Sequence, residues 1–368
     1  MMKVVFINNA RLCSGAEEHL IDLGHWLSQQ GVQLLFVTRV NSVFSARLKE
    51  ESLPFVPCFA EAGEKVRSIA RIARLLIREQ PDVISVNREH NIYPTWLASL
   101  LARPFLRRRP KMVMVFHTPT GRRYPILRSF DGIIATSQYT AASFVKANPG
   151  LPKSSAVIHY GIQLSPAPDP VKSVPERPRR FFRERGFPVI GMVGELWKNQ
   201  EELIPITQRL VEEFPSLCVA IVGGEGHASF AHLRDWIAAC GLERHFELVP
   251  RIPRSSVADV FYDFDLSVST HRNEGFGIVH IESLAAGTPV VAYRAGGLVE
   301  ILEKGGSILV DGGPEEFAQS VGRLLRNHEE RAGKAHEGRR VVEDEFSIDA
   351  MGGKHFEYYR SLIAGKPA

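Results

Sequence analysis

Hydrophobic and polar residues alternate between Met1 and Tyr160 in a pattern that predicts strands separated by helices. Short runs rich in β-branched residues are followed by longer stretches whose apolar residues fall on one helical face. Strands that alternate with helices of this length pair in parallel, so we predict a parallel sheet covered on both faces. The expected strands are Lys3–Ile7, Gln33–Thr38, Val83–Val86, Lys111–Phe116, Gly132–Ala135 and Ala156–His159, and the expected helices include Glu17–Gln29, Lys65–Glu79 and Tyr139–Ala147.

A proline-rich segment, Leu164–Arg185, then interrupts the pattern. Proline lacks the backbone N–H that a helix or a central strand needs, so this segment predicts a linker. The alternation resumes after it, and the tail from Pro314 is almost entirely helical in pattern. The sequence therefore predicts two doubly wound α/β domains, and ligands of such sheets bind in a cleft at the carboxyl ends of the strands. The expected strands of the second domain are Pro188–Val193, Cys218–Val222, Phe246–Val249, Asp265–Ser269 and Pro289–Ala292.

Composition excludes several classes of protein. The chain has 368 residues, of which 44% are hydrophobic and 23% charged, as in a globular protein with more than one core. The net charge of +4 is mild and lies in a few Arg-rich loops, which does not favour a nucleic-acid partner. Four widely spaced cysteines include no CxxC pair, which argues against a zinc site or a disulfide framework. The apolar start is too short for a signal peptide, so we expect a cytoplasmic protein.

The segment EGFGIVHIESLAAGTPVV, Glu274–Val291, carries the candidate chemistry. Its middle, about Ile278–Ala286, has helical composition and starts directly after the glycines Gly275 and Gly277. Backbone N–H groups at such a helix start bind phosphate, although Gly-rich turns also occur in α/β proteins without this role. Glu282 lies roughly 6–8 Å along the helix axis, about the span from a diphosphate to a ribose. Glu274 precedes the turn and would face the opposite end, where a sugar would lie.

The segment resembles the donor-site motif of the retaining glycosyltransferases of family 4, in which two glutamates separated by seven residues precede a small-residue helix and a GTPVVA strand. The resemblance continues through SGAEEHLIDLGHWLSQQGV, VFHTP, AIVGGEG, VPRIPRSSVADVFYDFDLSVS and FSIDAMGGKHFEYYRSLI. It implies the GT-B fold, with two Rossmann-like domains facing across a cleft. The implied parts are an acceptor-binding domain at 1–164, a linker at 165–186, a nucleotide-sugar-binding domain at 187–346 and a C-terminal helix at 347–368 that packs back on the first domain.

The resemblance also implies roles for individual residues. Glu274 would contact the donor sugar and Glu282 the nucleotide ribose, while the amides of Gly275, Phe276 and Gly277 approach the sugar and the diphosphate. These positions agree with the helix-start argument.

Two further positions come from the N-terminal domain. Gly15 matches a glycine loop that closes on the donor, although the family often has two adjacent glycines where this chain has Ser14-Gly15. His117, in VFHTP, matches a histidine that contacts the transferred sugar. His90 also follows a predicted strand, which makes it a weaker candidate for acceptor contact.

The segment VGELWKNQ departs from the family pattern. Family members place an arginine after the glycine and a lysine soon afterwards, and both cations hold the diphosphate. Here Lys198 remains after Gly194, but Glu195 stands at the arginine position. A carboxylate repels phosphate, so either Glu195 points away or another cation, such as Arg251 or Arg272, replaces the arginine. With His117 and Glu274, Lys198 completes the expected catalytic set.

Asp263 and Asp265 form a DxD sequence, which binds metal in a different glycosyltransferase fold. Here it runs directly into a predicted strand, which favours a structural role. We therefore expect no metal and no cofactor, with backbone amides and a lysine stabilising the departing diphosphate of a UDP-, GDP- or ADP-sugar.

Arg-rich loops at Arg103–Lys111, Arg122–Tyr124 and Arg177–Arg185 suit either solvent or an anionic membrane surface. The expected function is retaining transfer of a hexose-type sugar to a glycan or lipid-linked acceptor of the cell envelope, at the inner face of the plasma membrane. One alternative is an epimerase or phosphorylase of the same architecture, against which the glutamate pair argues. The other is a catalytically degenerate sugar-nucleotide-binding protein. An oxidoreductase is disfavoured because VGGEG lacks the GxGxxG spacing.

Overall fold

The computed structural model describes residues 1–59, 65–151, 154–164, 182, 188–224, 227–250, 252–253 and 256–365, with only the main chain described at 227–229. The chain divides into two compact units, which we call unit 1 (Met1–Gln163 and Phe346–Ala368) and unit 2 (Leu164–Glu345). Apart from Phe182, the predicted linker 165–186 lies outside the described residues.

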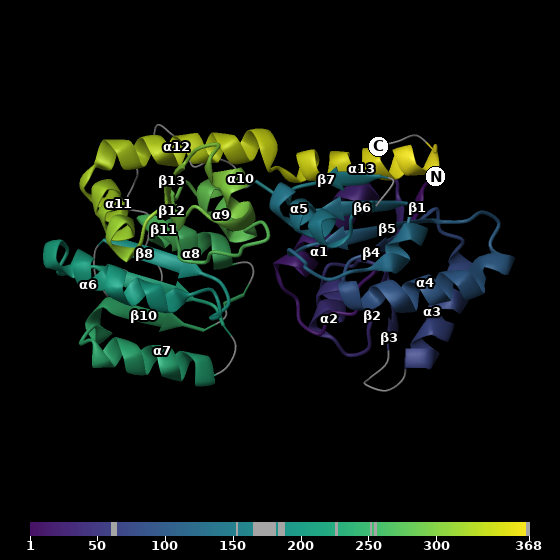
Figure 1. Ribbon diagram of the computed structural model, residues 1–368, viewed down its shortest axis with the longest axis horizontal. Coiled ribbons are helices and arrows are strands. Elements are labelled where there is room, and N and C mark those ends of the chain that lie inside the picture. Colours follow the sequence, from purple (N-terminus) through teal and green to yellow (C-terminus); the bar gives the residue numbers. More distant parts are fainter. Residues whose placement is uncertain are drawn as a thin grey trace. The chain divides into compact units, whose positions relative to one another are not determined.

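Unit 1 contains a parallel sheet that, among the described residues, has seven strands in the order β3-β2-β1-β4-β5-β6-β7 (Figure 1). One face of the sheet packs against helices α1, α2 and α13, and the other against α3, α4 and α5. The strands are β1 (Lys3–Ile7), β2 (Gln33–Arg39), β3 (Phe55–Phe59), β4 (Val83–Val86), β5 (Lys111–Phe116), β6 (Gly132–Ala135) and β7 (Ser155–Val157). The helices are α1 (Gly15–Gln29), α2 (Val43–Glu50), α3 (Lys65–Glu79), α4 (Ile92–Ala102), α5 (Gln138–Ala147) and α13 (Ile348–Ile363).

Helix α13 comes from the end of the chain but belongs to the core of unit 1. Tyr358, Tyr359 and Leu362 are buried in the same apolar cluster as Val4 and Phe6 of β1. The hydroxyl of Tyr359 donates a hydrogen bond to Ser85 Oγ at 3.3 Å. The N-terminal and C-terminal segments of the chain are therefore one folding unit.

Unit 2 contains a second parallel sheet, with six described strands in the order β10-β9-β8-β11-β12-β13. The strands are β8 (Val189–Val193), β9 (Cys218–Val222), β10 (Phe246–Val249), β11 (Leu266–Ser269), β12 (Val290–Tyr293) and β13 (Ser307–Val310). The helices are α6 (Leu203–Glu213), α7 (His227–Ala239), α8 (Val257–Asp263), α9 (Ile278–Ala285), α10 (Val299–Leu302), α11 (Pro314–Arg326) and α12 (His328–Glu345).

The two doubly wound domains predicted from the sequence are confirmed, since the strands described in both sheets pair in parallel and helices connect them. In each sheet the first strand lies in the middle, and the chain later returns to its other side: β4 beside β1 and β11 beside β8. The order of winding reverses at these strands, which is where ligands of such folds bind. No helix in the described parts of the chain is long and apolar enough to cross a bilayer.

Candidate functional site

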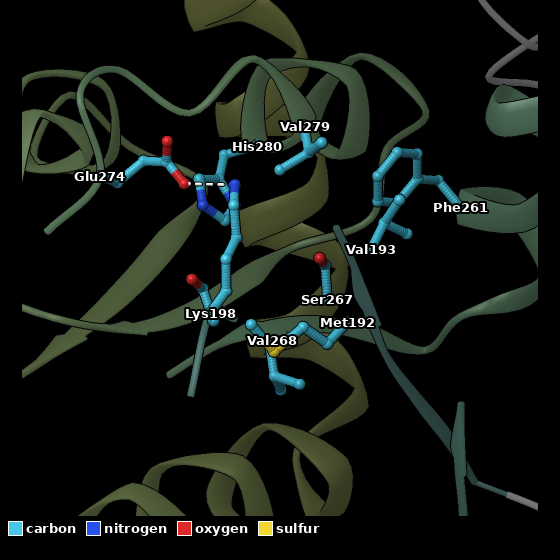
Figure 2. A pocket seen from close by; sticks show the side chains of 10 residues that line it. Met192, Val193, Lys198, Phe261, Ser267, Val268, Glu274, Val279 and His280 are labelled. Carbon is cyan, nitrogen blue, oxygen red and sulfur yellow. Dashed lines mark hydrogen bonds and ion pairs between the residues drawn. The ribbon is translucent and has the colours of Figure 1, made fainter. Parts of the chain in front are cut away.

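A small pocket lies in unit 2 between β8 and β11, at the carboxyl ends where the order of winding reverses. Figure 2 shows side chains converging on it from the two strands, from the loops that follow them, and from α8 and α9. The pocket has no room for a water molecule in this structure. The residues that line it include the apolar Met192, Val193 and Val268 and the polar or charged Lys198, Glu274 and His280.

Lys198 and Glu274 form an ion pair at this pocket. Lys198 Nζ donates to Glu274 Oε2 at 2.6 Å, and each side chain is only 15% exposed. Burial on its own would raise the pKa of Glu274, but the charge and hydrogen bond of Lys198 outweigh it and hold that pKa below its usual value. Glu274 is therefore ionised at neutral pH. The fold brings together two expected catalytic residues that are far apart in the sequence.

A glycine turn fixes Glu274 against the start of α9. Gly277 has a φ of +96°, and a Cβ there would lie 2.6 Å from His280 Cδ2. The backbone carbonyl of Glu274 accepts a hydrogen bond from the amide of Gly297 at 2.7 Å. No described side chain caps the start of α9. The expected residues Gly275 and Phe276 are buried in this turn, so the backbone around Glu274 is held from both sides.

Glu282 lies in α9 and is only 9% exposed. It is not among the residues that line the pocket. Glutamate side chains that have no functional role are normally exposed to solvent, so the burial of Glu282 distinguishes it from an ordinary helix residue.

His280 lines the pocket, and His271 lies close enough to feel the charges of Lys198 and Glu274; neither was predicted from the sequence. His280 is buried, and neither of its ring nitrogens has a hydrogen-bond partner among the described residues. Burial lowers the pKa of His280 to about 4, against the opposing effect of Glu274. Burial also lowers the pKa of His271, with Glu274 opposing and Lys198 adding to it. The imidazole of His280 lies beside the ion pair (Figure 2) and is neutral at neutral pH.

The loop after β8 places Gly194 against Lys198. Gly194 has a φ of +152°, and a Cβ there would lie 3.2 Å from Lys198 Cδ. The side chain of Glu195 is exposed, and it does not line the pocket. Arg272 stacks on the ring of Tyr293 at 3.6 Å and pairs with Glu202 at 3.3 Å. Arg251, the other candidate cation, lies outside the described residues.

The DxD sequence takes part in the architecture of the sheet. Asp265 Oδ2 accepts a hydrogen bond from the amide of Val189 at 2.8 Å, which ties the start of β8 to that of β11. Asp263 is 1% exposed. Among the described residues, including Asp263 and Asp265, no three His, Cys, Asp or Glu side chains are grouped so that they could hold a metal ion. These contacts support the structural interpretation of Asp265.

The remaining expected residues lie in unit 1, each after a strand of its sheet. Gly15 follows β1, His90 follows β4 and His117 follows β5, and these three strands are neighbours. Gly15 is the first residue of α1, whose N-cap is Ser14. His90 is exposed in the short helix Glu89–Asn91. The fold thus places all three residues after the carboxyl ends of adjacent strands in the sheet.

His117 is surrounded by buried polar groups. Its Nδ1 shares a hydrogen bond of 2.7 Å with the hydroxyl of Tyr160. Burial lowers the pKa of His117 to about 4, while Glu17 opposes this effect and Arg88 adds to it. His117 is therefore a neutral side chain at neutral pH.

Glu17, which was not predicted, is the buried carboxylate of this region. It is 0% exposed and accepts hydrogen bonds from Arg88 at 2.8 Å, Asn8 at 3.0 Å and Ser14 at 2.6 Å. Burial would raise the pKa of Glu17, but Arg88 and these hydrogen bonds lower it. The Glu17 carboxylate, through these hydrogen bonds, fixes the start of α1.

Comparison with known proteins identifies relatives for both units. The family model described as Glycosyltransferase Family 4 matches residues 13–165, and the one described as Glycosyl transferases group 1 matches residues 175–341. Among curated proteins, the D-inositol 3-phosphate glycosyltransferase of Thermobispora bispora is 30% identical over 209 residues, which are 53% of this chain and 48% of that protein. That of Xylanimonas cellulosilytica is 28% identical over 263 residues, 68% and 62% of the two chains. The matched part of the chain spans about half the length of the first of these relatives.

Solved structures extend the similarity to the whole fold. Anabaena Alr3699/HepE in complex with UDP and glucose superposes with a TM-score of 0.83 at 21% identity, over 98% of this chain and 100% of that one. A glycosyltransferase from Rickettsia africae gives a TM-score of 0.82 at 18% identity, over 98% of each chain. At these identities the likeness shows the fold alone.

Proposed function

Since the chain belongs to the glycosyl transferases group 1, with a family 4 N-terminal domain and the GT-B fold, we propose that it transfers a hexose-type sugar from a nucleotide diphosphate sugar to an acceptor with retention of configuration. One observation carries the proposal: the charged pair Lys198–Glu274 lies against the start of α9, at the point of the unit 2 sheet where ligands of this fold class bind. A lysine and a helix start together suit a diphosphate.

We propose that the donor diphosphate displaces Glu274 from Lys198. Without a donor, Glu274 is the counter-ion of Lys198 at 2.6 Å. A diphosphate brings more negative charge and also accepts hydrogen bonds from backbone amides at the start of α9. Lys198 then neutralises the phosphate, Glu274 is released toward the sugar, and the buried carboxylate of Glu282 accepts hydrogen bonds from the ribose hydroxyls.

In the transfer step, the bond between the anomeric carbon and the phosphate oxygen breaks, and the nucleoside diphosphate leaves with the electron pair. The acceptor hydroxyl forms a new bond to the same carbon, from the same face, and gives its proton to the departing phosphate. Lys198 and the backbone amides stabilise the negative charge that develops on the phosphate, without a metal ion. His117 is proposed to contact the transferred sugar through its neutral ring. His90 is the weaker candidate for acceptor contact.

For the acceptor we propose a glycan or a lipid-linked precursor of the cell envelope. The curated relatives are named for D-inositol 3-phosphate, so a phosphorylated cyclitol belongs in the acceptor panel. The Arg-rich loops at Arg103–Lys111 and Arg122–Tyr124 support association with an anionic membrane surface, which would present such an acceptor.

A panel of UDP-, GDP- and ADP-sugars tests the function. We expect one nucleotide class to raise the melting temperature, and the matching sugar nucleotide to release its nucleotide faster when an acceptor is added, with the same rate in EDTA. Stabilisation by no member of the panel would refute the proposal. Stabilisation without turnover on any acceptor would instead establish a degenerate binding protein. This alternative is considered because Glu195, which is exposed, stands where the family usually has a diphosphate-binding arginine. Loss of activity in EDTA would contradict a metal-free reaction.

A further inference from the structure

The outer face of helix α4 is apolar. Tyr93, Leu97, Leu100 and Leu101 are 53%, 39%, 47% and 55% exposed, and Phe105 in the following turn is 65% exposed. Their spacing of three and four residues places them on one side of the helix, opposite the buried side that packs into the core. Exposed apolar residues that lie together on one side of a helix are a candidate interaction site, unlike apolar residues scattered singly over a surface. We call these five residues the apolar stripe.

Helix α3 packs beside α4 and exposes arginines instead (Figure 1). Arg67, Arg71, Arg74 and Arg78 follow one another at intervals of four, three and four residues, and all four are exposed. The opposite side of α3 is buried in the same core as α4. We call these four residues the arginine stripe. Two adjacent helices therefore present a basic row next to an apolar row.

The arginine stripe borders a hollow of about 270 Å³ over the edge strand β3. Arg71, Arg74 and Arg78 line it on one side, and Val56, Pro57 and Cys58 line it on the other. Guanidinium groups above an apolar floor suit a phosphate ester whose remaining part is apolar or weakly polar.

Gln80 joins the two stripes at one end. Its side-chain amide donates to the carbonyl of Phe105 at 3.0 Å, and its carbonyl oxygen accepts from the amide of Arg107 at 2.8 Å. These bonds attach the turn that carries Phe105 to the C-terminal end of α3. The apolar stripe is thus held beside the arginines, and exposed arginines at 107 and 108 continue the positive charge.

We propose that the apolar stripe and the arginine stripe dock unit 1 on an anionic lipid bilayer, with the leucines and aromatic rings in the interface and the arginines on headgroup phosphates. Charge selects this occupant: a second copy of the chain would bring its own arginines against this face, and a nucleic acid would leave the leucines uncovered. The inference rests on the proposed membrane association and assigns it to α3 and α4.

Flotation of the protein with vesicles tests the assignment. We expect binding to vesicles of phosphatidylcholine with phosphatidylglycerol and weak or no binding to phosphatidylcholine alone. Combining Arg71→Gln with Arg74→Gln is expected to weaken binding by roughly 30-fold. Combining Leu97→Ser, Leu100→Ser and Leu101→Ser is expected to weaken it more than roughly 10-fold. All of these side chains are exposed, so the variants should fold.

The control variants replace exposed arginines and an exposed apolar residue outside α3 and α4. Arg209→Gln with Arg323→Gln removes two exposed arginines of unit 2, and Val145→Ser removes a valine that is 51% exposed on α5. Both controls are expected to bind vesicles like the wild type, and every variant should keep its stabilisation by the donor nucleotide. Wild-type protein that ignores anionic vesicles, or stripe variants that bind as well as the controls, would overturn the assignment. So would a dimer, seen by sedimentation, that the leucine substitutions abolish. Absence of donor stabilisation would instead count against the proposed transferase function.

Discussion

Glu274 and Lys198 carry opposite charges 2.6 Å apart in a pocket without room for water. Removing one partner of such a pair leaves the other charge buried without compensation, which costs more than the pair itself contributes. Glu274 pairs with Lys198 in this structure, and in the proposed mechanism the donor diphosphate competes for the same lysine. This competition separates the contribution of Glu274 to binding from its contribution to transfer.

Glu274→Gln tests that separation. The glutamine side chain no longer forms an ion pair with Lys198, so the nucleoside diphosphate should bind to the variant as tightly as to the wild type or more tightly. The turnover rate should fall about 100-fold, because the carboxylate proposed to face the sugar is lost. Titration calorimetry and initial rates measure the two quantities. The control is Glu195→Gln, an exposed glutamate in the loop after β8 that should change neither by more than about threefold. Equal losses of affinity and rate in Glu274→Gln would contradict the assigned role.

His280 predicts how stability depends on pH. Its pKa is lowered to about 4 in the folded protein, below the usual 6.5, because the ring is buried. Between these two pH values the unfolded chain binds more protons, so the free energy of unfolding falls as the pH drops from 6.5 to 4, by up to about 3 kcal/mol for this residue. Denaturant titrations at pH 7 and pH 5 should show the fall. His280→Gln should reduce it, whereas His328→Gln, at an exposed histidine, should not. An unchanged pH dependence in His280→Gln would be the contrary result.

Some residues of the site could be predicted from the sequence and others could not. Glu274, Glu282 and Lys198 stand in motifs whose spacing resembles a known family, so they can be recognised from the sequence alone. His280 stands in the same motif but becomes notable only through its burial beside the ion pair. Glu17 depends on Arg88, a partner from another strand end that local pattern does not reveal.

Among the secondary-structure elements, β1, β4, β5, β6, β9 and β10 have the predicted bounds, because each is a short apolar run between turn residues. Strands β3 and β13 were not predicted. Strand β3 contains Pro57 and lies at the edge of its sheet, where a missing N–H costs little. Strand β13 follows two glycines and has only four residues, also at an edge. In both strands only two residues are buried, which weakens the hydrophobic pattern in the sequence.

The turn before α9 depends on glycine at one position. Gly277→Ala places a Cβ 2.6 Å from His280 Cδ2 at a φ of +96°, and we expect a loss of stability of about 1–3 kcal/mol together with weaker nucleotide binding. The control is Gly333→Ala, in the exposed interior of α12 with nothing within 4 Å, which should raise stability by up to about 1 kcal/mol. Thermal denaturation with and without nucleotide compares them. Equal behaviour of the two variants would contradict a strained turn.

Over the whole molecule, the chain leaves unit 1, forms unit 2 and returns to complete the first core with α13. The helix was expected at this place only through the family resemblance, because the pairing of segments more than three hundred residues apart leaves no local pattern. The aromatic residues of α13 fill space between α1 and the sheet, so unit 1 cannot reach its full stability until α13 has been synthesised.

Tyr359→Ala tests this dependence. Tyr359 is 0% exposed and hydrogen-bonded to Ser85, so its removal should destabilise unit 1 by about 3–5 kcal/mol. Hydrogen exchange should rise in β1 and β4 while the strands of unit 2 stay protected. Ile363→Ala, on the same helix but 39% exposed, should cost less than about 1 kcal/mol. Faster exchange spread equally over both units would contradict the division.

The central claim is that the pocket of Lys198 and Glu274 holds the diphosphate of a nucleotide sugar. Titration calorimetry of the stabilising nucleotide against the wild type and Lys198→Met tests it most directly. We predict measurable binding to the wild type and an affinity roughly 10–100-fold lower in Lys198→Met, since a charge-assisted hydrogen bond is lost. Equal affinity in the two proteins, or no binding of any nucleoside diphosphate to the wild type, would contradict it.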